Sequence, residues 1–342
     1  MESKSMKSKE AGLVDPLDVG RLRIRNRIVF PAYFSRTASE KGEVTPQMIE
    51  RYSALAEGAG LIVVEQAFVS QDGRSNQNQL DMSRDDKIEG LRKLTDAIHG
   101  KGAKAIVQLN HAGRHTTSQV TGQQILAPSP ISEKEDAEIP REVSQEDMWR
   151  IGDAFSDAAA RSLRAGFDSV EVHCAHWYLL SQFLSPLSNR RTDEYGGSID
   201  NRMRFPLEVV RKVVKAIPDT RVFCRLGATD MLDGGLTLED GLKVAEGLEA
   251  AGISVIDVSA GLGGIQPLDP NARVQGFFVP YATAVKKVVK INVIGVGGIK
   301  DPLFADSLVK EGRTDLVAVG RAFNANPNWA KEAISILTKP RP

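Results

Sequence analysis

The chain has 342 residues, of which 42% are hydrophobic and 26% are charged, and its 44 Lys and Arg balance its 44 Asp and Glu. This length is sufficient for one large domain with its own core, and the charge balance argues against a nucleic-acid-binding surface. No apolar run approaches the roughly 20 residues that a membrane-spanning helix requires. The Lys- and Ser-rich start has no apolar segment behind it, so we expect a disordered tail over residues 1–12 and no signal peptide.

The two cysteines, Cys174 and Cys224, both lie within apolar, strand-like runs. Such positions are typical of small buried side chains in a reducing compartment, so we expect a cytoplasmic protein. Two cysteines are also too few for an iron–sulfur cluster, which usually takes about four.

Short apolar runs rich in Val and Ile recur along the chain and end in polar or glycine-containing segments. Their nearly continuous hydrophobicity is typical of parallel strands that are covered on both faces. The predicted strands cover residues 27–33, 61–69, 104–111, 169–176, 222–228, 255–260, 291–298 and 316–321.

Amphipathic stretches of helical length lie between these runs, and Thr237 is a suitable N-cap for one of them. The predicted helices cover residues 46–57, 86–99, 145–165, 199–216, 238–251 and 302–310. Strands that alternate with helices in this number predict an α/β fold, a closed (β/α)8 TIM barrel. We therefore expect a single barrel domain over residues 13–338.

Three further segments frame the predicted barrel. Residues 17–19 and 22–24 predict a short N-terminal hairpin, which we expect to cap the barrel floor. The long connections 112–143 and 177–198 both follow strands. They therefore belong to the C-terminal face, where barrel enzymes place their active sites.

The fourth predicted strand ends in His173, His176 and Tyr178. Because residues 173 and 176 point to opposite faces of a straight strand, these side chains converge only if the chain turns there. Imidazole N–H groups can bind a carbonyl or nitro oxygen, and a tyrosine can deliver a proton. Two alternatives stay open: zinc ligation, for which no third ligand lies nearby in the sequence, and plain core packing.

Glycines follow the last two predicted strands, with Gly297 and Gly298 after the seventh and Gly320 after the eighth. Glycines at these places let backbone N–H groups approach a phosphate, and Arg321 adds a charge-assisted contact. A simple turn at each strand end is the alternative.

Arg225 lies within the fifth predicted strand, where an unpaired cation would be costly to bury. It therefore faces either a bound anion or acceptor, or a buried Asp or Glu. Gln108 presents an amide in a similar setting, with hydrogen bonding inside the core as the alternative. Combined with the phosphate-type glycines, these residues predict a phosphorylated cofactor whose ring lies across the barrel mouth.

The sequence resembles a known family, the Old Yellow Enzyme family of FMN-dependent ene-reductases. It is more similar to the bacterial branch of this family than to the plant and fungal branch. The resemblance runs over residues 16–336. Its most specific stretch is residues 173–205, HCAHWYLLSQFLSPLSNRRTDEYGGSIDNRMRF, and shorter matches include RNRIVFP at 25–31, QLNHAGR at 108–114 and GVGGIKDP at 295–302.

The resemblance implies an FMN oxidoreductase that takes electrons from NADH or NADPH and reduces small electron-poor substrates, with no metal, and a homo-oligomer such as a dimer or tetramer. His173 and His176 would bind the substrate oxygen and Tyr178 would donate the proton. The residues implied for FMN are Pro31, Ala32 and Tyr33 along the ring, Gln66 beside it, Gln108 and Arg225 at its pyrimidine edge, and Gly297, Gly298, Gly320 and Arg321 at the phosphate.

The chain departs from the family pattern beside the expected flavin edge. Tyr33 stands where the family has a Cys or Thr, Ser35 where the bacterial branch has a Tyr, and Trp177 where it has a Gly. Gln66 replaces a residue that is more often small. The glycine that the family usually has at position 177 occupies backbone geometry that a Cβ tolerates poorly, so we expect Trp177 to shift the start of the loop and to move Tyr178. Its indole then either packs beneath the loop or narrows the acceptor pocket.

Two other functions remain open. One is an FMN-dependent NAD(P)H oxidase, or a flavin or quinone reductase, with little ene-reductase activity. The other is a barrel without flavin, such as a metal-dependent hydrolase or an aldolase. That reading needs a metal-ligand set or a Schiff-base lysine at a strand end, and the sequence offers neither.

Overall fold

The structure, a computed structural model, describes residues 11–262 and 274–339. Its centre is a barrel of parallel strands, closed because β3 (Ile28–Phe30) pairs with both β4 (Leu61–Phe68) and β13 (Leu316–Ala318). The other barrel strands are β6 (Lys104–Asn110), β9 (Ser169–Cys174), β10 (Phe223–Gly227), β11 (Val255–Ser259) and β12 (Asn292–Gly295). The predicted (β/α)8 TIM barrel is confirmed.

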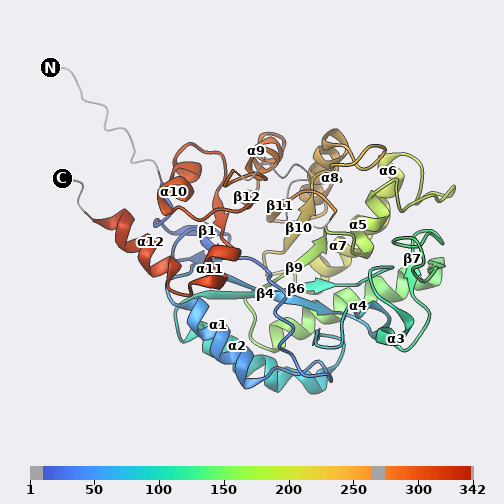
Figure 1. Ribbon diagram of the computed structural model, residues 1–342, viewed down its shortest axis with the longest axis horizontal. Helices are drawn as coiled ribbons and strands as arrows, with labels where there is room; N and C mark the ends of the chain where they lie inside the picture. The colour runs from blue at the N-terminus through green and yellow to red at the C-terminus, as the bar shows by residue number, and fades with distance from the viewer. Residues whose placement is uncertain (1–10, 263–273, 340–342) are drawn as a thin grey trace.

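A helix follows each barrel strand and covers the outside of the barrel (Figure 1). These helices are α1 (Pro46–Ala56), α2 (Ile88–His99), α4 (Gln145–Arg164), α7 (Arg204–Ala216), α8 (Leu238–Ala250), α9 (Val279–Val288), α10 (Pro302–Lys310) and α12 (Trp329–Thr338). Shorter elements are α3 (Ser118–Thr121), α5 (Leu179–Leu184), α6 (Ile199–Arg202), α11 (Arg321–Ala325), β5 (Leu80–Asp81), β7 (Leu126–Ala127), β8 (Arg141–Glu142) and single 3-10 turns at Gln71–Gly73 and Asp85–Lys87. Within the described ranges, no helix is both long and apolar enough to cross a bilayer.

Several element boundaries differ from the prediction for local physical reasons. The helix predicted over 199–216 is interrupted at Met203, which divides it into α6 and α7. The helices α9 and α12 were not predicted from the sequence. Strand β9 ends at Cys174, before the predicted end at 176, because His176 and Trp177 have positive φ angles of 59° and 65°. Such angles are incompatible with a strand.

The predicted N-terminal hairpin is formed by β1 (Leu17–Val19) and β2 (Leu22–Ile24), which pair antiparallel. The buried side chains of Val19 and Ile24 belong to the same apolar cluster as Phe223 and Val255, the first residues of β10 and β11. The hairpin therefore caps the barrel floor, as expected. Of the tail expected over residues 1–12, residues 1–10 lie outside the described part of the chain.

The inward-pointing side chains of the strands form two layers inside the barrel, one apolar and one polar. The inward residues near the strand starts are apolar, as in Ile106, Phe223 and Val255. Two positions further along, the same faces carry Gln108, Arg225 and Asp257, all buried. Because side chains on a strand alternate with a period of two, each polar residue lies directly above an apolar one. The polar layer thus lies toward the C-terminal ends of the strands.

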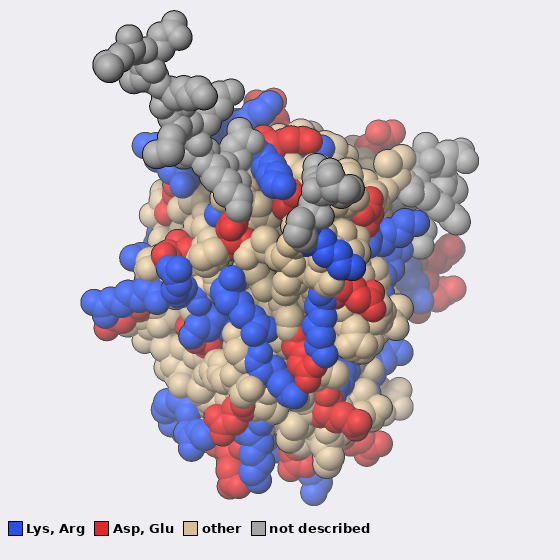
Figure 2. All heavy atoms as spheres, turned by 90° about the vertical axis from the view of Figure 1, so that its left-hand side faces the viewer, with Lys and Arg blue, Asp and Glu red and all other residues tan. Residues whose placement is uncertain are grey.

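The surface carries charges of both signs. On the face shown in Figure 2, Lys and Arg side chains are interspersed with Asp and Glu, which agrees with the equal totals in the sequence. Such mixing gives no large field of one sign on this face.

Candidate active site

A cavity of about 730 Å³ opens where the barrel strands end. All of the site residues predicted from the sequence line it, so the fold brings together residues from seven different strand ends. They are Pro31, Ala32, Tyr33, Gln66, Gln108, His173, His176, Tyr178, Arg225, Gly297, Gly298, Gly320 and Arg321. A cavity of this size is large enough for a cofactor and part of a substrate.

The floor of the cavity contains a buried polar network. Arg225 forms an ion pair with Asp257, with Nη1 and Oδ2 2.5 Å apart, and Gln108 donates through Nε2 to Glu171 Oε1 over 2.7 Å. The alternatives left open for Arg225 and Gln108, a carboxylate partner and hydrogen bonding in the core, are thus both observed. Both residues nevertheless line the cavity, and Arg225 Nε is buried without a hydrogen-bond partner among the described residues.

The two carboxylates of this network share one cation, so their protonation is unequal. Burial, followed by the nearby charge of Asp257, raises the pKa of Glu171 to about 8, although Arg225 opposes this shift. Burial also raises the pKa of Asp257, against the attraction of Arg225. We assign the proton near neutral pH to Glu171, because Asp257 holds the direct ion pair with Arg225.

The chain turns after β9, and this turn brings His173, His176 and Tyr178 together. The ring centroids of the two histidines are 5.2 Å apart, and those of His173 and Tyr178 are 4.8 Å apart. His176 Nε2 lies 2.8 Å from the hydroxyl of Ser259, at the end of β11. Burial lowers the pKa of both histidines well below the usual value, so both rings are neutral near pH 7.

Metal ligation is not supported in the described ranges, because no group of three or more His, Cys, Asp or Glu side chains there is arranged to hold a metal ion. The three remaining histidines each lie beside a carboxylate. His99 lies 2.6 Å from Asp168, His111 approaches Asp72, and His115 lies 2.5 Å from Glu133.

The opposite side of the cavity is made of backbone. Gly297 and Gly298 have positive φ angles of 128° and 64°. A Cβ on Gly297 would lie 2.6 Å from the backbone nitrogen of Phe278, and one on Gly298 would lie 2.7 Å from the ring of Phe277. Only glycine fits both positions. Arg321 begins α11 at the same side, with its guanidinium 5.8 Å from the ring centre of Phe277.

Comparison with known proteins identifies the family. Residues 12–339 match the family model described as the NADH:flavin oxidoreductase / NADH oxidase family. The chain belongs to this family. It is 44% identical to an NADH oxidase of Thermoanaerobacter brockii over 92% of its own length, but it spans only 49% of that protein. It is 37% identical to an NADPH dehydrogenase of Bacillus subtilis, with 95% of both chains covered.

A solved structure agrees with this assignment. The Old Yellow Enzyme homologue of Zymomonas mobilis superposes with a TM-score of 0.83 at 25% identity, over 96% of this chain and 94% of that one. The resemblance to the Old Yellow Enzyme family is therefore confirmed. Family membership also supports the predicted cofactors, FMN and NADH or NADPH.

The cavity fits FMN at both of its ends. At one end, Gly297 and Gly298 line the cavity without side chains, and the Arg321 cation lies beside them. At the other end, Arg225 and the amide residue Gln108 line the wall. A phosphate suits the first end and a polar ring edge suits the second.

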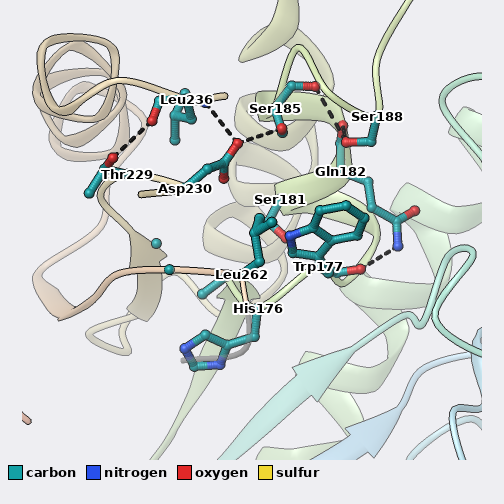
Figure 3. A pocket seen from close by; sticks show the side chains of 13 residues that line it. His176, Trp177, Ser181, Gln182, Ser185, Ser188, Thr229, Asp230, Leu236 and Leu262 are labelled. Atoms are coloured by element: carbon teal, nitrogen blue, oxygen red, sulfur yellow. Dashed lines mark hydrogen bonds between the residues drawn. The ribbon is translucent and has the colours of Figure 1, made fainter. Parts of the chain in front are cut away.

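Trp177 and Tyr33, the two bulky departures from the family pattern, both line the cavity. Trp177 has a positive φ of 65°, so it adopts backbone geometry that favours glycine, whereas a shift of the loop was expected. Its indole packs against Arg114, whose guanidinium carbon lies 4.4 Å from the ring centre. Its carbonyl accepts a hydrogen bond from Gln182 beside a second, small cavity (Figure 3). The indole therefore both packs under the loop and narrows the main cavity.

Sequence reasoning missed several residues of the site. Phe277, Phe278 and Glu133 line the cavity from loops that carry no local motif. Glu171 and Asp257 could have been found, because each lies two residues before another inward polar residue, His173 and Ser259 respectively. A period-two pattern of polar residues inside apolar strands was the available signal.

The first prediction concerns the phosphate end. Arg321→Ala should weaken FMN binding between roughly 10- and 150-fold, because a hydrogen bond to a charged group contributes about 1.5–3 kcal/mol. The loss should fall toward the lower end, since Arg321 is exposed to solvent. Fluorescence titration of FMN with FMN-free protein measures the dissociation constant. Arg23→Ala, on the hairpin at the barrel floor, is the control and should change nothing; an equal affinity in both variants would contradict this assignment.

The second prediction concerns Glu171. Its pKa in the folded chain, about 8, lies above that of an unfolded glutamate. The contribution of Glu171 to the free energy of unfolding is therefore fully present only below about pH 4.5 and falls as the pH rises toward 8. Between about pH 4.5 and 8 the parent should lose stability relative to Glu171→Gln, by on the order of 1 kcal/mol per pH unit. Urea unfolding of the FMN-free protein at several pH values measures this difference. The exposed Glu135→Gln should follow the parent, and parallel pH profiles for Glu171→Gln and the parent would refute the prediction.

Proposed function

We propose that this chain is an FMN-dependent NAD(P)H oxidoreductase that reduces activated alkenes or related electron-poor acceptors. The observation that carries the proposal is the convergence of two neutral histidines and a tyrosine in one cavity. The ring centroid of His173 lies 5.2 Å from that of His176 and 4.8 Å from that of Tyr178, and all three residues line the cavity. When bound, FMN would accept a hydride from NAD(P)H and deliver it to the β-carbon of the acceptor.

The two histidines are suited to bind the oxygen of the acceptor. His173 lines the cavity, where the N–H of its neutral ring can donate to a carbonyl or nitro oxygen. Ser259 holds the other ring through His176 Nε2. Because both imidazoles are neutral, each keeps one N–H donor without the cost of burying a charge. Their N–H groups would stabilise the negative charge that develops on this oxygen.

Tyr178 is suited to protonate the α-carbon. Burial raises its pKa, so the phenol keeps its proton at neutral pH. As the Tyr178 O–H bond breaks, a C–H bond forms at the α-carbon, and the hydride on the β-carbon completes the reduction. The phenol then recovers its proton from solvent.

The other predicted residues have roles toward FMN in this proposal. Gln108 and Arg225 would contact the pyrimidine edge, where a cation favours the negative charge of a reduced flavin. The ring would lie along Pro31, Ala32 and Tyr33, with Gln66 beside it, and the phosphate would lie at Gly297, Gly298, Gly320 and Arg321.

A second candidate is an NAD(P)H oxidase, or a flavin or quinone reductase, with little activity on alkenes. Two observations favour it: the 44% identity to a protein named NADH oxidase, and the bulk of Tyr33 and Trp177 in the cavity wall. Flat or slender acceptors fit such a wall better than bulky ones. The two candidates differ in whether Tyr178 must deliver a proton to carbon.

The third prediction separates these candidates. Tyr178→Phe should leave reduction of the flavin by NAD(P)H nearly unchanged, because that step needs no proton from the phenol. Reoxidation by an activated alkene should slow by roughly 10²–10⁴-fold, the usual contribution of a general acid. Anaerobic rapid mixing measures the two half-reactions separately, with Tyr195→Phe as a control outside the cavity. Equal slowing of both half-reactions, or no slowing with the alkene, would count against Tyr178 as the acid.

A further inference from the structure

Gln66 makes a contact that its expected place beside the cofactor does not explain. Its Nε2 donates a hydrogen bond to the hydroxyl oxygen of Tyr178 over 2.6 Å, and its Oε1 accepts one from Asn110 Nδ2, also over 2.6 Å. Gln66 is 5% exposed and Asn110 is completely buried. The three side chains thus form a chain of hydrogen bonds that ends on the phenol.

A bulge in β4 aims Gln66 at Tyr178. Val64 pairs with Val107 and Ala67 pairs with Leu109, so β4 has one residue more than β6 over this stretch. Because of the extra residue, the side chains of Glu65 and Gln66 make contacts on different sides of the strand. The carboxylate of Glu65 accepts hydrogen bonds from Ser35 and Tyr52, whereas Gln66 lines the cavity. Bulges of this kind commonly re-aim a side chain next to an active site.

Asn110 fixes which end of the Gln66 amide meets the phenol. In the observed arrangement, the atom left without a partner among the described residues is Asn110 Oδ1, an acceptor. Turning both amides over would place Gln66 Oε1 at the Tyr178 hydroxyl and leave the Asn110 NH₂ unpaired instead. Buried donors without partners are rarer than buried acceptors without partners. The amide therefore presents its N–H, and Tyr178 accepts.

We propose that Gln66 is a positioning residue that orients Tyr178 to donate its proton to the acceptor. The inference rests on the proposed function. Because the phenolic oxygen accepts from Gln66, its own proton is not engaged by the amide and remains available to the substrate. Once that proton has left, the same N–H stabilises the phenolate oxygen. The Gln66 N–H is only a donor, so it does not compete with the substrate for the proton of the phenol.

Several other groups also face Tyr178. They are Glu133, Arg36 and Ser75, together with the rings of His115 and His173 at centroid distances of 5.2 and 4.8 Å. Burial has the largest effect and raises the pKa of Tyr178, and the charge of Glu133 raises it further. The hydrogen bond from Gln66 is the largest effect in the opposite direction, ahead of Ser75 and Arg36.

Gln66→Met tests the proposal, because it keeps an unbranched side chain of similar length and removes the amide. A fluorotyrosine placed at position 178 brings the titration into a pH range where the fold is stable, and ¹⁹F NMR of the FMN-loaded protein follows it. The pKa should rise by about one to two, since a hydrogen bond to a charged group is worth roughly 1.5–3 kcal/mol and one pKa unit is about 1.36 kcal/mol. The alkene half-reaction should slow by less than the roughly 10²-fold or more expected on losing the hydroxyl.

The chain offers a matched control. Gln145 Nε2 donates to the hydroxyl of Tyr195 over 3.4 Å, outside the cavity. Gln145→Met should leave the pKa at position 178 and both half-reactions unchanged. Asn110→Leu is the second variant: it keeps Gln66 but releases its orientation, and should raise the pKa at position 178 by less than Gln66→Met does.

These measurements distinguish the possible failures. An unchanged or lowered pKa at position 178 in Gln66→Met would overturn the proposal, whatever the rates. So would a rise that Gln145→Met reproduces. A raised pKa combined with alkene reduction that does not depend on Tyr178 would instead refute the proposed function and leave the hydrogen bond as described.

Discussion

The alternation of side chains along eight parallel strands is the constraint on which the rest of this molecule depends. In a closed barrel, every second residue of each strand must lie inside, and the interior has no access to bulk water except at its ends. Apolar residues such as Ile106 and Phe223 fill the lower layer against the hairpin. The polar residues one step higher therefore meet each other, and they form a site only because the barrel is closed.

This arrangement sets the electrostatics of the site. Arg225 supplies one cation to two buried carboxylates, and the direct ion pair with Asp257 leaves Glu171 to hold a proton. The charge of this network is thus nearly balanced, while Arg225 still lines the cavity. Burial and the nearby guanidinium of Arg225 both disfavour a second positive charge, so the histidines above this layer are neutral.

The barrel, the hairpin and the residues of the cavity could be predicted from the sequence, because hydrophobic periodicity and strand-end motifs are local signals. The conformation at Trp177 was not predicted, because a shift of the loop was expected there and the residue instead has a positive φ. The partners of the polar residues could not be predicted either. Asp257 lies 32 residues from Arg225, and Tyr178 lies 112 residues from Gln66, and their pairing depends on strand register and on a bulge that leaves no mark in composition. Helix α9 was missed because its Val-rich sequence lacks a clear amphipathic pattern.

In the proposed function, the neutral pair His173 and His176 binds the oxygen of the acceptor beside the flavin. Titration of the FMN-loaded protein with a phenol tests this most directly, because a phenolate oxygen imitates the developing enolate and its ring stacks on the flavin. The parent should develop a long-wavelength charge-transfer band, and a variant carrying His173→Ala and His176→Ala should lose that band while it keeps its FMN. A band of equal strength and equal phenol affinity in the double variant would contradict the account.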